Sequence, residues 1–132
     1  MNFSEFIQNF AEEIGGQYSE YDESKSVLII PIDDFRFQTV VGEIRLLKHY
    51  DKTAIEFSSK VCPATEDIDL ELLLRENTKF CHAKFSIVDG FVRVEASIFI
   101  ETVSEELLKE IIMEVAKMAD EWEYKLTGMD VY

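Results

Sequence analysis

The sequence predicts an α+β fold: a helix, an antiparallel meander of three to four strands, a short helix, a β-hairpin, and a long C-terminal helix packed on the sheet. Two patterns indicate it. Apolar residues recur with helical spacing near both ends of the chain, and they alternate with polar residues between. The 132 residues, 47% of them hydrophobic, match one domain with a sizeable core. We therefore expect residues 1–132 to form a single α+β domain.

The first element is an amphipathic helix near the N-terminus. Asn2 or Ser4 can accept hydrogen bonds from its first N–H groups. Gly15-Gly16 follows the apolar pattern, and glycine readily adopts the left-handed conformation that ends a helix. The residues that predict the apolar face are Phe3, Phe6, Ile7, Phe10 and Ile14.

A strand meander follows the glycines. Residues 17–22 and the apolar run 27–30 predict two short strands or one bent hairpin, and Pro31 indicates that this strand lies at an edge or ends there. Residues 37–47 alternate, with positions 40, 42, 44 and 46 on an apolar face. A turn at 49–52 leads into an antiparallel strand at 53–59, in which Ile55 and Phe57 share a face.

The second half predicts a helix, a hairpin and a helix. Good helix formers at 68–76 can be capped by Thr65, Asp67 or Asp69. Asp89-Gly90 supplies the positive φ angles of a type I′ turn between alternating strands at 83–87 and 92–100. The final helix begins at Thr102 or Ser104 and ends at Gly128. Its apolar stripe consists of Leu108, Ile111, Ile112, Val115, Ala119, Trp122 and Leu126.

Charge and hydropathy reduce the possible partners. There are 13 basic residues against 27 acidic ones, a formal net charge of -14, and the basic residues are scattered from Lys25 to Lys125. Nucleic acids and anionic membranes attract clustered basic residues, so we expect neither as a partner.

No apolar run approaches the roughly 20 residues of a membrane span, and the N-terminus lacks a secretory signal. The expected location is cytoplasmic.

The chemistry-bearing residues do not form a recognisable reactive site. His49, His82, Cys62 and Cys81 lack the paired spacing of zinc ligands. Neither cysteine has an identifiable base, and the glycines follow a helix where a phosphate-binding loop would precede one. We therefore expect no catalytic residue, no metal and no cofactor, and a protein that is not an enzyme.

One face of the predicted hairpin is a candidate interaction surface. If Val92 and its alternating partners point into the core, the residues between them point outward. The alternatives are that a second layer, such as the first helix, covers these residues, or that they are isolated apolar groups on the surface. The candidate residues for a partner or dimer face are Val88, Phe91, Arg93 and Phe99.

The order of elements resembles the type III secretion chaperone-like fold, including YbjN-type bacterial domains. The resemblance is strongest from Leu70 to Leu126, and the first half matches only in element order. The segments that carry it are Arg75-Glu76-Asn77, Ala83-Lys84-Phe85-Ser86, Asp89-Gly90, Ser104-Glu105-Glu106-Leu107 and Ala119-Asp120. The resemblance implies a non-enzymatic protein-binding module, often dimeric, in which an extended partner segment lies over sheet and helix surfaces.

Two functions follow as hypotheses. The first is a chaperone-like or regulatory adaptor, a homodimer that binds a protein partner through sheet and helix surfaces. The second is a small-ligand-binding stress or signalling regulator with a pocket between the long helix and the sheet. A ligand of the second kind would raise the melting temperature of the protein, because it binds only the folded state.

Overall fold

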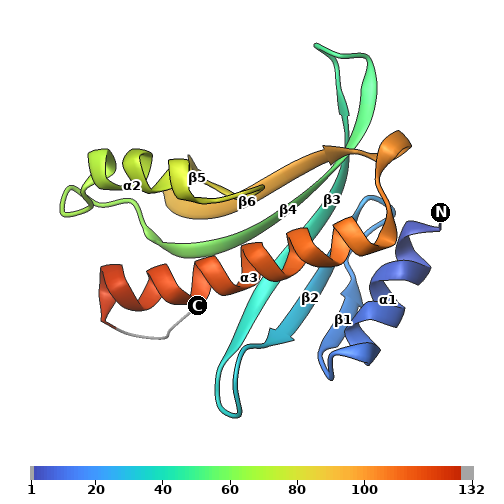
Figure 1. Cartoon of the computed structure of the whole chain (residues 1–132), viewed down its shortest axis with the longest axis horizontal. Helices are drawn as coiled ribbons and strands as arrows, with labels where there is room; N and C mark the ends of the chain where they lie inside the picture. Colours follow the sequence, from blue (N-terminus) through green and yellow to red (C-terminus); the bar gives the residue numbers. More distant parts are fainter. Residues whose placement is uncertain (1, 129–132) are drawn as a thin grey trace.

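The computed structural model describes residues 2–128, which form an antiparallel sheet with helices α1 and α3 on one of its faces (Figure 1). The fold class predicted from the sequence is confirmed. The elements are α1 (Phe3–Glu13), β1 (Gln17–Glu20), β2 (Lys25–Pro31), β3 (Phe37–Leu47), β4 (Lys52–Pro63), α2 (Leu70–Glu76), the 3-10 turn η1 (Asn77–Lys79), β5 (Lys84–Val88), β6 (Phe91–Phe99), the 3-10 turn η2 (Ile100–Thr102) and α3 (Glu105–Thr127).

The sheet has six strands in the order β1-β2-β3-β4-β6-β5, and all neighbours are antiparallel. Strands β1 to β4 form the predicted meander. The hairpin β5–β6 extends the same sheet, with β6 beside β4 and β5 at the edge. Strand β2 ends at Pro31, so the proline marks a strand end rather than an edge strand.

The core lies between the sheet and the two long helices. Side chains of alternate strand residues meet the apolar stripe of α3, and α1 packs over β1 and β2. Fully burying one aliphatic or aromatic side chain contributes roughly 1.5–3 kcal/mol, so this interface is the main source of stability. Its largest fully buried apolar residues are Ile7, Leu28, Ile30, Ile55, Phe57, Leu108, Ile111 and Ile112.

The helix caps and the hairpin turn lie where the sequence predicts. Asn2 Oδ1 accepts the Glu5 N–H at 3.0 Å, and Ser104 Oγ accepts the Leu107 N–H at 3.1 Å. Gly128 ends α3 with φ of 71°. In the β5–β6 turn Asp89 and Gly90 have φ of 52° and 79°, as a type I′ turn requires.

Three segments differ from the expectation. Strand β4 runs to Pro63, beyond the predicted end at 59, because a bulge between Lys60 and Cys62 keeps it paired with β6. Leu46, predicted on the apolar face, is 59% exposed, in the β3–β4 hairpin that projects beyond α3 (Figure 1). The short helix begins only at Leu70, because Asp69 caps it by accepting the Leu72 N–H.

Carboxylates of α3 anchor two distant segments. Asp120 accepts hydrogen bonds from Arg36 in the β2–β3 turn, and Glu114 accepts the N–H groups of residues 81–83, which precede β5. Both contacts fix the position of α3 on the sheet. Within residues 2–128, no helix has the length and apolar character needed to cross a membrane.

Candidate functional site

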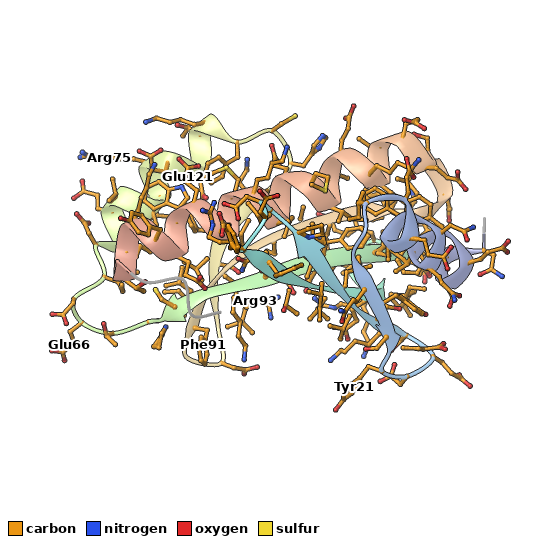
Figure 2. The ribbon with its side chains drawn as sticks, turned by 90° about the horizontal axis from the view of Figure 1, so that it is seen from below. Tyr21, Glu66, Arg75, Phe91, Arg93 and Glu121 are labelled. Carbon is orange, nitrogen blue, oxygen red and sulfur yellow. The ribbon has the colours of Figure 1, made fainter. Side chains whose placement is uncertain are left out.

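The sheet face opposite α1 and α3, here called the outer face, carries no helix among the described residues. Figure 2 shows Phe91, Arg93 and Tyr21 on the side of the molecule away from α3. Helix α1 packs on the other face, where Phe6, Ile7 and Phe10 are buried. The sequence left open that the first helix covers the candidate residues of the hairpin. The structure excludes this, because α1 lies on the opposite face.

The structure brings three of the four candidate residues together. Val88 pairs with Phe91 across the β5–β6 hairpin, and Arg93 lies two residues further along β6. Phe99 shares their face but lies eight residues from Phe91, a distance of roughly 27 Å along a strand. All four side chains are half-buried, so the phenylalanines are less exposed than the alternation alone suggests.

Lysines cover the aromatic rings of the outer face. Lys60 Nζ lies 4.4 Å from the ring centroid of Phe91, and Lys52 Nζ lies 5.1 Å from that of Phe99. At the far side of the sheet Lys25 Nζ lies 5.6 Å from the ring of Tyr21. Each contact places a cation over an aromatic face, a geometry worth about 0.5–1 kcal/mol at exposed sites.

A network of ion pairs occupies the middle of the outer face. The nearly buried carboxylate of Glu56 accepts hydrogen bonds from Arg45 Nη1 at 2.7 Å and from Arg93 Nη2 at 3.2 Å. Arg93 Nη2 also lies 3.2 Å from Glu95. Two arginines and two glutamates balance one another, so the network adds no net charge to the face. Within residues 2–128, the buried Arg93 Nε finds no hydrogen-bond partner.

The strand register gathers basic residues on the outer face, although they are scattered in the sequence. Six of the 13 basic residues occupy outward strand positions, against three glutamates, which gives this face a charge of about +3. The three α-helices instead carry twelve acidic residues and four basic ones. The outward basic residues are Lys25, Arg45, Lys52, Lys60, Lys84 and Arg93, and the outward glutamates are Glu43, Glu56 and Glu95.

The outer face is hollowed at two places. A hollow of about 520 Å³ extends over β2, β3, β4 and β6, and Val27 and Val41 are among its apolar residues. Its charged residues are Lys25, Lys60 and Arg93 and the carboxylate of Glu43. A second hollow of about 200 Å³ lies around Ala54 near the other end of β4. The first hollow is within the usual size range of ligand sites. No residue of α3 lines it, so it is not the pocket between helix and sheet expected of a ligand-binding regulator.

The cysteines and histidines take no part in the ion pairs of Glu56, Arg45, Arg93 and Glu95. Cys62 is buried, and its pKa is raised by burial and by the nearby carboxylate of Glu123, which makes its thiolate scarce. Cys81 is exposed, and its backbone N–H and that of His82 are bound by Glu114. Across residues 2–128, no three histidine, cysteine or acidic side chains are placed to hold a metal ion.

Sequence reasoning identified the hairpin side of the outer face but missed the β2–β4 side. Lys25, Val27 and Val41 occupy outward strand positions, and the signal that could have found them is the period-2 pattern already used for the hairpin. A further apolar surface was also missed. Leu70 and Leu74 lie one turn apart on α2 and are 48% and 69% exposed.

The described residues thus form a sheet with helices on one face and a hollowed, charged second face. No family model and no curated protein matches the sequence. Among solved structures, a chain of the ExsC–ExsE complex is similar with a TM-score of 0.63 and 17% identity, covering 96% of this chain and 97% of that one. A chain of the HopA1–SchA chaperone–effector complex has a TM-score of 0.64 and 15% identity, with 92% of each chain covered.

A third similar structure is that of the Yersinia pestis type III secretion chaperone SycH in complex with a stable fragment of YscM2. Its TM-score is 0.60, with 17% identity, and the match covers 92% of this chain and 99% of that one. The protein therefore has the type III secretion chaperone-like fold, as its order of elements predicts. The narrower resemblance to YbjN-type domains stays a prediction.

Proposed function

We propose that this protein is a non-enzymatic protein-interaction module, a chaperone-like or regulatory adaptor that holds a segment of a partner protein on its outer face. The observation that supports this proposal most is the outer face itself. Among residues 2–128 no helix covers it, and it combines two hollows, half-buried aromatic residues and a net positive charge. Similar folds are found in chaperone complexes with partner proteins.

A partner segment gains two kinds of contact on this face. Apolar side chains that enter the hollows are removed from water, which contributes roughly 25 cal/mol of binding free energy for each Å² of apolar surface buried. Polar groups meet the ammonium groups of Lys25, Lys52 and Lys60, which stand over aromatic rings. The candidate residues Val88, Phe91, Arg93 and Phe99 belong to this face, and we propose that they contact the partner.

The test compares proteins that copurify with wild-type and variant chains. We expect the variant with Phe91→Ser and Phe99→Ser to lose a partner that wild type retains, because both changes remove aromatic contact area from the outer face. The matched control is Phe35→Ser with Tyr124→Ser, which alters two exposed aromatic residues elsewhere, 92% and 67% exposed. Quantitative mass spectrometry of the bound fractions gives the readout. Equal recovery of every bound protein by both variants and wild type would rule out the outer face.

The homodimer is also part of the proposal, through a different surface. Leu70 and Leu74 expose an apolar stripe on α2 that a second copy of the chain can cover. Light scattering after size exclusion should give a dimer mass for wild type and a monomer mass for Leu70→Ser with Leu74→Ser. A monomer mass for wild type at high concentration would refute the dimer and leave partner binding by the outer face intact.

A further inference from the structure

We infer that the outer face selects a partner segment in which a large apolar residue is flanked by acidic residues. This inference rests on the proposed function and specifies the chemistry of the partner. It follows from three features of the larger hollow: the lysines on its two sides, the apolar residues between them, and the charge of the rest of the molecule.

Among the described residues the two lysines beside the hollow form no direct ion pair, although Asp22 and Glu43 lie near Lys25. Among the described residues neither Lys25 nor Lys60 lies within ion-pair distance of an acidic side chain, although the chain has 27 acidic residues. Each ammonium group instead stands over an aromatic ring, of Tyr21 and Phe91 respectively. A cation over a ring keeps most of its capacity to donate hydrogen bonds, so both lysines can bind an incoming carboxylate.

The spacing of the strands sets the pattern of the segment. Lys25 lies on β2 and Lys60 on β4, on either side of β3, and Lys60 is four residues further along the sheet than Glu56, the residue level with Lys25. Two strand spacings across and four residues along put their backbones about 16 Å apart. Val27 and Val41 supply the apolar surface of the hollow between them. An extended segment that inserts an apolar side chain there continues on both sides of the hollow, so acidic residues that flank the apolar one come within reach of the long side chains of Lys25 and Lys60.

Electrostatics direct such a segment to this face. The outward strand positions carry about +3, whereas the α-helices carry twelve acidic residues against four basic ones and therefore repel an acidic segment. The central network of Glu56, Arg45, Arg93 and Glu95 is balanced, so the attraction comes from the four remaining outward lysines, which outnumber the one remaining glutamate, Glu43. Complementary charge of this kind mainly determines specificity and the rate of association.

The experiment uses three fluorescent pools of short peptides and the full chain. Mixed Leu, Ile, Phe and Met occupy the central position of each pool, and the flanking positions are fixed as Glu, Gln or Lys. We expect the Glu pool to bind best by fluorescence anisotropy and its affinity to fall as salt rises.

The variant with Lys25→Glu and Lys60→Glu should bind the Glu pool about tenfold more weakly or worse. The matched control, Lys48→Glu with Lys117→Glu, changes the net charge equally at exposed positions off the hollow and should have little effect.

Four results would overturn the inference. They are equal binding of the three pools, equal weakening by both double variants, tighter binding of a single-stranded oligonucleotide at the same lysines, and a wild-type dimer that Lys25→Glu with Lys60→Glu dissociates. The inference and the proposed function can fail separately. A partner lost with the Phe91 and Phe99 variant, together with no preference for the Glu pool, would leave the proposed function standing and refute only the acidic segment.

Discussion

Asp120 on α3 accepts two hydrogen bonds from the guanidinium of Arg36 in the β2–β3 turn, at 3.2 Å from Nε and 3.1 Å from Nη2. The Asp120 side chain is only 8% exposed. Arg36 Nη1 also lies 2.7 Å from Asp33 in its own turn. One guanidinium thus joins a tight turn to a helix that lies 84 residues further along the chain.

We predict that Asp120→Ala lowers the free energy of unfolding by about 1.5–3 kcal/mol, the usual contribution of hydrogen bonds to charged groups. The change removes both bonds and leaves the helix side of the contact without an acceptor. Urea unfolding at neutral pH measures the effect. The control is Glu71→Ala, which breaks an ion pair with Arg75 whose side chains are 73% and 75% exposed, and which should change stability little. An equal effect of both variants would contradict the role of the Arg36 contact.

The second prediction concerns pH and Glu114. Burial acts to raise the pKa of this carboxyl, but the N–H groups of Ala83, His82 and Cys81 and the charge of His82 together hold it below its usual value of 4.5. A lowered folded-state pKa stabilises the fold fully above about pH 4.5, and this contribution is lost as pH falls through the folded pKa.

Glu114→Gln should therefore destabilise the protein at neutral pH, and the difference from wild type should shrink as the solution is acidified. The glutamine oxygen can replace only one of the two acceptor atoms, and its NH₂ group faces a donor. Unfolding midpoints across the acidic range give the measurement. Glu110→Gln, an exposed change on the same helix, is the control. A difference that grows on acidification would show that the sign of the pKa shift is wrong.

Local signals in the sequence were sufficient for the elements but not for their assembly. The Asp89-Gly90 turn and the Ser104 cap were predicted because each depends on a few neighbouring residues. The position of β6 beside β4 was not, since the pairing of Ile55 with Ile98 joins residues 43 positions apart. Nothing in the local pattern distinguishes that partner from another strand with the same alternation.

The candidate site was likewise predictable only where it depends on a single strand. Phe91, Arg93 and Phe99 were placed on one face by the alternation of a single strand. The hollow was not predictable, because Lys25 and Lys60 come from strands whose order becomes known only in the folded sheet. The scattered basic residues of the sequence gave no sign of a positive face for the same reason.

The third prediction separates two adjacent glycines after α1. Gly15 has φ of 73°, and a Cβ atom there would meet no neighbouring atom, so Gly15→Ala should cost about 1–2 kcal/mol through backbone conformation alone. A Cβ at Gly16 would instead overlap the carbonyl oxygen of Ile29 on β2, so the β1–β2 pairing must shift. We expect Gly16→Ala to cost about 2–3 kcal/mol and to speed hydrogen exchange in β1. Equal costs, or unchanged exchange, would argue against a steric role for Gly16.

The fourth prediction concerns Glu56, the shared partner of two arginines on the outer face. Its side chain is 12% exposed and that of Arg93 is 18% exposed, so removing the carboxylate leaves Arg93 as a poorly hydrated cation that retains its ion pair with Glu95. Glu56→Ala should lower the free energy of unfolding by about 2–3 kcal/mol, somewhat less than for a fully buried pair.

The decisive comparison is the double variant Glu56→Met with Arg93→Met. If the cost of Glu56→Ala arises from an unbalanced buried charge, replacing both partners by apolar side chains should recover most of the stability, because desolvation of an ion pair offsets much of its attraction. If the pair stabilises the sheet by its own attraction, the double variant will be at least as unstable as the single one. Urea unfolding of Glu56→Ala and the double variant distinguishes the two cases, and adding Glu56→Met and Arg93→Met alone completes the cycle that isolates the coupling energy between the two side chains.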